Sequence, residues 1–144
     1  MEKIDSFKGE YEFLSNFSYS PFIYKDIFYP TVEHYFQANK ATTLAKHKEI
    51  ARATTPSQAK WLGRGTRLRP DWREVREEVM EVGLRQKFRQ NPELLQKLLD
   101  TGDAYLEEGN TWNDRYWGVC RGVGQNKLGH LLMKLREEYK EYYV

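Results

Sequence analysis

The chain has 144 residues, of which 40% are hydrophobic and 15% aromatic, with 10 Tyr and 4 Trp. Its 23 basic and 21 acidic residues leave a net charge of only +2. This balance argues against a general electrostatic surface for nucleic acid but leaves a local basic patch open. The length is enough to bury one core without disulfides, so we expect a single domain over residues 1–144.

Cysteine usage and the absence of long apolar windows indicate the compartment. Cys120 is the only cysteine and cannot form an intrachain disulfide, so we expect a cytoplasmic protein. Met1 leads into charged and aromatic residues without the apolar core of a signal peptide, and no window is long enough to span a membrane. The three His and one Cys do not have zinc-ligand spacing. We expect no structural metal, no cofactor and no membrane partner.

Two short aromatic runs near the N-terminus predict a β-hairpin. Residues 22–24 and 27–29 flank Lys25-Asp26 as two strands flank a turn. The preceding residues 12–18 place polar groups between apolar anchors. This segment is interpreted as a capped turn, although its polar side chains could also hold a ligand.

A helix is predicted to begin after Pro30, because Thr31 can cap its first amides and apolar residues then recur at helical spacing. On this helix Glu33, Gln37 and Lys40 fall at i, i+4 and i+7, which places them in one row. A carboxylate, an amide and an amine in one row could form a catalytic site. The alternative is a solvated helix face, on which the helix dipole favours an early Glu.

Four more helices are predicted before residue 102. They cover residues 44–52, residues 56–62 after a Thr55–Gln58 capping box, residues from an N-cap at Asp71 to about 89, and residues 92 to about 101. Gly63 is predicted to end the second of them. Residues 104–106 are interpreted as one more strand. A last amphipathic helix carries a core stripe of Leu128, Leu131, Leu132, Leu135 and Tyr139, with Met133 as core filler.

Two loops could bind a ligand. After Gly63, residues Arg64, Arg67 and Arg69 form a basic loop that could receive a phosphate or could simply be solvated. Trp72 follows, either as a hydrophobic staple or as a stacking platform. Residues 111–126 mix acid, amide and aromatic side chains with glycines, and they lead into a helix whose first amides are expected to be free for an anion. The glycine spacing matches neither a dinucleotide fingerprint nor a P-loop.

The order of elements predicts an α+β fold that is mainly α, a compact single-domain helical bundle with a small N-terminal antiparallel β element. Three segments together resemble the NADAR superfamily. They are Ser15-Asn16-Phe17 with Pro21-Phe22, residues 29–38 with Lys40, and residues 113–118 leading to Asn126-Lys127-Leu128-Gly129 and residues 131–133. The resemblance covers nearly the whole chain.

The resemblance implies a mostly helical fold and cleavage of an N-glycosidic bond to ribose. Some members of the family destroy ribosylamino-pyrimidine phosphates of early riboflavin biosynthesis, and others remove ADP-ribose from guanine. By matching positions, the resemblance implies four active-site residues: Glu33, Trp72, Asp114 and Trp117. Residues 119–121, Val-Cys-Arg, depart from the smaller residues expected there. This departure bears on substrate preference, not on the class of the site.

These residue types suit the chemistry. Breaking an N-glycosidic bond develops positive charge on the ribose and negative charge on the departing base. Glu33 and Asp114 could divide the tasks of stabilising the sugar or activating water and of protonating the base. Lys40 could instead attack the anomeric carbon as an imine-forming amine, which requires a depressed pKa. The residues expected to bind the base, the sugar and its phosphate are Trp72, Trp117, Asn16, Arg64, Asn113, Asn126 and Lys127, with Arg67 as a further phosphate candidate.

The leading hypothesis is an N-glycosidase that acts on small-molecule ribosylamine phosphates. A second enzymatic hypothesis is an ADP-ribosyl-guanine glycohydrolase, for which nucleic acid would be a partner only as a modified substrate. A non-catalytic module that binds ADP-ribose and a purely structural helical protein are the alternatives from other classes.

Overall fold

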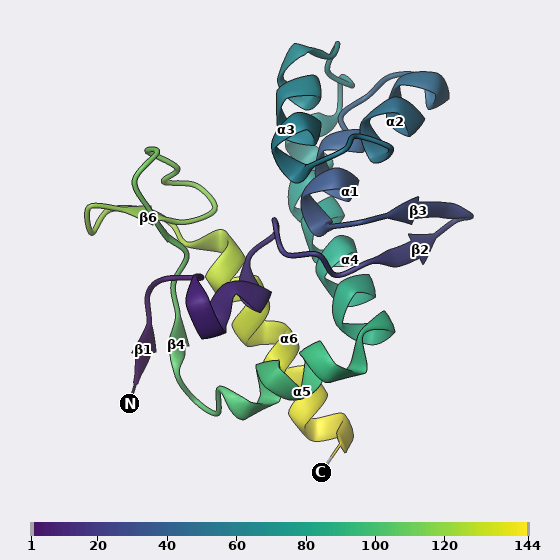
Figure 1. The fold of residues 1–144 in the computed structure, drawn as a ribbon. Coiled ribbons are helices and arrows are strands. Elements are labelled where there is room, and N and C mark those ends of the chain that lie inside the picture. The colour runs from purple at the N-terminus through teal and green to yellow at the C-terminus, as the bar shows by residue number, and fades with distance from the viewer. Residues whose placement is uncertain (1, 144) are drawn as a thin grey trace. The chain divides into compact units, whose positions relative to one another are not determined.

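The computed structural model describes residues 2–143, and its contacts divide the chain into two compact units. Residues 16–92 form one unit, and residues 2–15 form the other together with residues 93–143. The secondary structure is mainly helical with a few two-stranded sheets (Figure 1), which confirms the predicted class, α+β and mainly α. Within residues 2–143, none of the helices has the length and apolar character needed to cross a membrane.

The unit of residues 16–92 is built around its first helix. Strands β2 (Phe22–Tyr24) and β3 (Ile27–Tyr29) form the predicted antiparallel hairpin and lead into α1 (Val32–Ala38). Helices α2 (Leu44–Ala51), α3 (Pro56–Gly65) and α4 (Trp72–Gln90) follow, and all three pack against α1 (Figure 1). Every residue of α1 is buried. A helix surrounded in this way presents polar side chains to protein instead of water.

The predicted helix starts are confirmed in position, though one cap differs. Thr31 and Thr55 accept backbone N–H groups as N-caps, and the Gln58 side chain accepts from the N–H of Thr54. Asp71 precedes α4 as predicted, but its carboxylate makes no capping hydrogen bond. It pairs instead with the Arg69 guanidinium, with Nε 2.6 Å from Oδ1, because a bidentate charged partner competes well with neutral amides.

Gly63 does not end α3, contrary to the prediction. The helix continues to Gly65, so Arg64 lies in its last turn and not in a loop. A Cβ atom at residue 63 would collide with Oε1 of Gln37, so the glycine leaves room for the Gln37 side chain where α3 lies against α1. The prediction treated the glycine as a helix terminator, whereas the packing uses it as a contact point.

His34 ties the start of α1 to the connection between α2 and α3. Its backbone N–H donates to Thr31 Oγ1. The carbonyl of Ala53 can only accept, so Nε2 carries the proton and donates to it at 3.0 Å. In the neutral ring Nδ1 is then the acceptor and receives the Thr31 hydroxyl at 2.8 Å. The side chain is buried, and this burial lowers its pKa below the usual 6.5, opposed in part by the bond to Ala53.

The second unit joins segments from both ends of the chain. Strand β1 (Lys3–Ile4) pairs in parallel with β4 (Tyr105–Leu106), and β5 (Gly109–Asn110) pairs in parallel with β6 (Val119–Cys120). A 3-10 helix, η1 (Gly9–Leu14), and the helices α5 (Pro92–Asp100) and α6 (Lys127–Tyr143) complete it. Helix α6 packs on β4 (Figure 1), and Leu128, Leu132 and Leu135 of its predicted stripe are buried. Among these strands the sequence predicted only β4, because strands this short carry no periodicity and pair with residues distant in the chain.

We predict that the stability of the protein falls as the pH drops below about 6.5, in part through His34. Because its folded-state pKa is lowered, the unfolded chain binds this proton first, so the stability is fully present above 6.5 and is lost toward the lower folded pKa. Thermal midpoints measured between pH 8 and 5 would test this. The variant His34→Gln is expected to have a lower thermal midpoint, and this midpoint should change less between pH 8 and pH 5. The control variant His130→Gln replaces an exposed histidine and is expected to show the same change of midpoint with pH as the unsubstituted protein. Equal slopes for all three proteins would contradict the prediction.

Candidate functional site

The predicted polar row on α1 is present, but it is not a solvated face. Glu33 is 7% exposed and Gln37 is 4% exposed. The Gln37 amide donates from Nε2 to Glu33 Oε2 at 2.7 Å, while Gln37 Oε1 is buried without a hydrogen-bond partner. Burying a carboxylate is costly unless hydrogen bonds and charges hold it. The solvated-face alternative is therefore wrong.

Lys40 extends this row as an amine with altered acidity. Burial is the largest cause and lowers its pKa below the usual value, while the negative charge of Glu33 opposes this change. The positive charges of Arg64 and Lys60 lower the pKa further. The ammonium nitrogen lies 5.7 Å from the ring centroid of Phe36. A lowered pKa is the property that an imine-forming role for Lys40 requires.

Trp72 packs beside this row as a largely internal ring. Its centroid lies 5.0 Å from that of Phe36 in an edge-to-face arrangement, and only 6% of the residue is exposed. In this structure the ring offers little free face, which is typical of an aromatic core contact. Its role as a stacking platform stays a prediction.

Asn16 lies at the start of α1 and retains an unused acceptor. Its backbone carbonyl accepts the N–H of Glu33 at 3.1 Å, and its side-chain amide donates to the sulfur of Met80 at 3.4 Å. The side-chain oxygen is buried without a hydrogen-bond partner. Such an orphaned acceptor costs free energy that a donor on a ligand could recover. This supports the predicted role of Asn16 in binding.

The loop with Asp114 and Trp117 belongs to the other unit. Asp114 Oδ1 accepts the backbone N–H groups of Tyr116 at 3.1 Å and Trp117 at 3.0 Å. The Asn110 side chain donates to the Asp114 carbonyl and to a Glu108 carboxylate oxygen, and accepts the N–H of Asp114. Asp114 therefore fixes the turn that presents Trp117. The sequence analysis missed Asn110, which has no motif but lies four residues before Asp114.

The remaining predicted residues of this loop differ in exposure. Asn113 is exposed with a left-handed backbone, φ 66°, and Trp117 is half-buried, with its ring 5.0 Å from that of Tyr116. A half-buried ring on a fixed turn suits stacking against a planar group. Substrate contacts of Asn113 and Trp117 stay predictions.

The start of α6 is not a free anion site, contrary to the expectation. The amides of Lys127 and Leu128 donate to the carbonyls of Tyr116 at 3.1 Å and Trp117 at 2.9 Å. The preceding loop thus satisfies donors that helix starts usually leave open. The Lys127 side chain lies over the Tyr116 ring at 5.4 Å and remains a candidate for phosphate binding.

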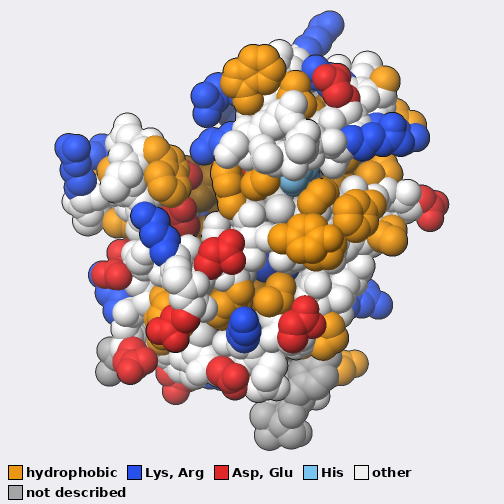
Figure 2. Space-filling view, viewed as in Figure 1, with side chains coloured by type: hydrophobic (Ala, Val, Ile, Leu, Met, Phe, Trp, Pro, Cys, Tyr) orange, Lys and Arg blue, Asp and Glu red, His pale blue; other side chains and the backbone are white. Residues whose placement is uncertain are grey.

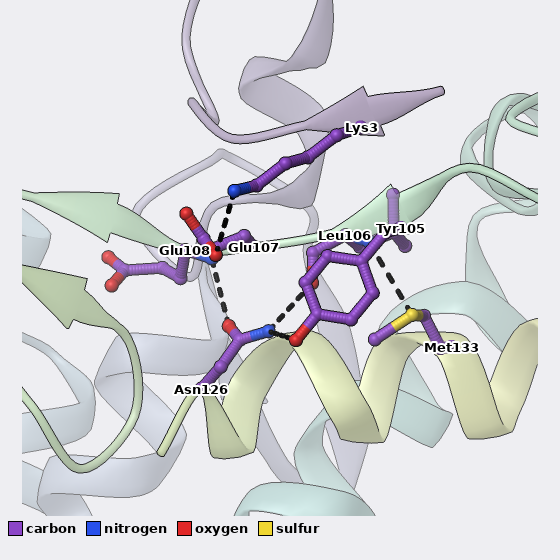
Figure 3. Close-up of polar contacts among 7 residues, drawn as sticks. All are labelled: Lys3, Tyr105, Leu106, Glu107, Glu108, Asn126 and Met133. Carbon is purple, nitrogen blue, oxygen red and sulfur yellow. Dashed lines mark hydrogen bonds and ion pairs between the residues drawn. The ribbon is translucent and has the colours of Figure 1, made fainter. Parts of the chain in front are cut away.

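Asn126 holds the loop to the rest of its unit (Figure 3). The residue is 2% exposed, and its Oδ1 accepts the N–H of Glu108 at 3.0 Å. Its Nδ2 donates to the carbonyl of Leu106 at 2.9 Å and to the hydroxyl of Tyr105 at 3.3 Å. Both amide hydrogens are used inside the protein. The predicted contact of Asn126 with substrate therefore finds no support in this geometry.

We predict that Asp114→Ala destabilises the protein by about 1–2 kcal/mol, because two backbone amides lose their acceptor. Asp114→Asn keeps an oxygen acceptor at this position and is expected to retain most of the stability. Urea unfolding of both variants would measure the difference. Equal stability of Asp114→Ala and the unsubstituted protein would show that the turn does not depend on this side chain.

Comparison with known proteins places the chain in a family. Residues 5–140 match the NADAR domain. The chain is 43% identical over 136 residues to N-glycosidase YbiA of Escherichia coli strain K12, covering 92% of this chain and 84% of that protein. It is 39% identical to N-glycosidase Npun_R5314 of Nostoc punctiforme, covering 90% and 86%. It is also 38% identical to riboflavin biosynthesis protein VVA0006 of Vibrio vulnificus, covering 90% of this chain and 36% of that protein.

The fold agrees with a solved relative. The NMR structure of E. coli YbiA superposes with a TM-score of 0.87 at 40% identity, covering 99% of this chain and 88% of that one. The predicted enzyme class is confirmed, and the chain is an N-glycosidase. On its sequence match and its fold, the chain belongs to the NADAR family.

Proposed function

We propose that residues 1–144 act as one N-glycosidase domain that hydrolyses ribosylamino-pyrimidine phosphates of early riboflavin biosynthesis. The family match over residues 5–140 and the Vibrio relative named a riboflavin biosynthesis protein support this substrate class. We further propose that the enzyme works in the cytoplasm, as its single cysteine suggests.

The observation that carries the proposal is the buried Glu33 carboxylate near an amine with a lowered pKa. A carboxylate fixed by Gln37 in a largely water-excluded position can stabilise positive charge on the ribose ring. It can also take a proton from the attacking water. Either task makes Glu33 the central catalytic group.

Lys40 provides an alternative covalent route. Its neutral amine attacks the anomeric carbon, and the bond from that carbon to the base breaks with its electron pair leaving on the base. The amine loses two protons in forming the imine: one is taken up by the departing base and the other by the ring oxygen, whose bond to the anomeric carbon breaks as the ring opens. Water then hydrolyses the imine, which releases the ribose phosphate and restores the amine. The lowered pKa of Lys40 supports this route, because it increases the neutral fraction.

The other predicted residues receive separate roles. Asp114 is proposed to protonate the departing base, in addition to holding its turn. Trp72 and Trp117 are proposed to contact the base. Arg64 and Lys127 are proposed to contact the phosphate, and Asn16 and Asn113 to contact polar groups of the substrate. The variant Asp114→Asn keeps the structural contacts of this residue but removes its charge, so its turnover tests the catalytic role of the charge.

A direct assay tests the substrate class. The purified protein is incubated in parallel with a ribosylamino-pyrimidine phosphate and with ADP-ribosylated guanosine, and base release is followed by chromatography. We expect release from the first substrate to be faster. Faster release from the second would establish the ADP-ribosyl-guanine alternative. The enzyme class already argues against the non-catalytic and purely structural alternatives.

We predict that Glu33→Gln lowers the turnover at least about 100-fold, with substrate binding retained. The amide has nearly the same size and can still accept the hydrogen bond from Gln37, but it has no negative charge. The thermal midpoint is therefore expected to stay close to that of the unsubstituted enzyme. Rate and midpoint are measured on the same preparation, and a fully active Glu33→Gln enzyme would remove this residue from the mechanism.

A further inference from the structure

The two edges of the β2–β3 hairpin differ. On β2, the Gln90 side chain accepts the N–H of Ile23 and donates to its carbonyl, both at 2.9 Å. Ile23 pairs with Phe28 in the antiparallel register. Because the backbone groups of Ile23 point away from β3, this pair is of the non-hydrogen-bonded kind, and the N–H and C=O of Phe28 point away from β2. Gln90 therefore covers the edge of β2, and no side chain of residues 2–143 bonds the backbone of Phe28 in the same way.

A groove runs along this open edge of β3. It has a volume of about 460 Å³ and lies within the unit of residues 16–92. Residues 26–28 and Pro30 line one side, and Lys48 and residues 51–53 line the other. Figure 1 shows β3 on the side of the hairpin toward α2 and β2 on the side toward α4, in agreement with the contacts of these elements. A ligand in the groove can therefore reach the backbone of Phe28.

The hairpin also exposes an apolar pair beside the groove. Ile23 is 58% and Phe28 51% exposed, and as cross-strand partners they share one face of the hairpin. Phe22 and Tyr29 alternate with them on the other face and are each only 2% exposed. In the view of Figure 2, hydrophobic side chains gather over the hairpin. A further strand beside β3 would place an apolar side chain against Phe28 and cover part of this pair.

The charge of the groove selects the kind of strand. Lys48 and Arg52 line it from α2 and its C-cap, and their i, i+4 spacing places them on one side of the helix. Asp26 contributes one carboxylate from the hairpin turn. Two cations and one carboxylate leave the groove net positive, which favours a ligand with acidic side chains.

We propose that the groove between β3 and α2 binds an acidic, extended segment of a partner protein, which adds to β3 as a further strand. One residue of the segment exchanges two backbone hydrogen bonds with Phe28 and packs its apolar side chain against the ring. Acidic residues beside it contact Lys48 and Arg52. None of the residues of the polar row on α1 lines this groove, so the inference does not depend on the proposed reaction.

The test uses a synthetic peptide of alternating glutamate and valine residues, blocked at both ends. NMR of the isotope-labelled full chain follows its binding and the hydrogen exchange of the Phe28 and Ile23 amides. One control peptide has lysine in place of glutamate, and another has N-methylated valines, which cannot donate to a strand. The protein variants are Arg52→Glu, Arg52→Lys and Arg73→Glu, the last of which reverses the same charge on α4 outside the groove.

We expect the acidic peptide to slow the exchange of the Phe28 amide. The Ile23 amide should be unaffected, because it already donates to Gln90. Arg52→Glu should weaken binding about tenfold, since it replaces an attractive charge with a repulsive one. Arg52→Lys and Arg73→Glu should bind like the unsubstituted protein, and neither control peptide should slow the Phe28 amide.

Several outcomes would overturn the assignment. An unchanged Phe28 amide in the presence of the acidic peptide would remove the groove as a binding site. Equal binding of the lysine peptide, or of the acidic peptide by Arg52→Glu, would refute the role of charge. Equal binding of the N-methylated peptide would refute strand addition. Slower exchange of the Phe28 amide on raising the protein concentration alone would identify a second copy of this chain as the occupant instead.

Discussion

The close approach of α3 to α1 at Gly63 is the contact on which the candidate catalytic row depends. Residue 63 is a glycine, so the Gln37 side chain has room between the two helices. Its amide donates to the Glu33 carboxylate. The carboxylate is then oriented in a position that water reaches only slightly. The same approach brings Lys60 and Arg64 near the row, because they flank the glycine on one helix face. The missing Cβ atom at residue 63 therefore leaves the space that the Gln37 side chain occupies beside Glu33.

Burial sets the chemical properties of this row. Desolvation raises the free energy of any charged group, so Lys40 is pushed toward its neutral form while Glu33 opposes the change. The unused acceptors of Asn16 and Gln37 add to the cost of folding. Polar groups buried in this way are a poor source of stability and a common property of sites arranged for a ligand.

The loop of residues 110–118 is organised by a different principle, the pairing of its backbone groups with the Asp114 side chain and with the start of α6. Asp114 accepts two loop amides, and the carbonyls of Tyr116 and Trp117 accept the first amides of α6. The amides of Lys127 and Leu128 are thereby occupied, which favours phosphate recognition by cationic side chains. This is the physical reason for assigning the phosphate to lysine and arginine and not to a helix terminus.

The sequence by itself determined the features that depend on neighbours along the chain. The caps at Thr31 and Thr55, the β2–β3 hairpin, the amphipathic α6 and the row of Glu33, Gln37 and Lys40 all follow from local spacing. Only the tertiary structure decided that this row is buried, that Gly63 continues its helix, and that Asn126 is occupied inside the protein. It also decided the β1–β4 and β5–β6 pairs. Each of these depends on residues distant in the chain, and two-residue strands or a single glycine carry no local pattern that specifies a distant partner.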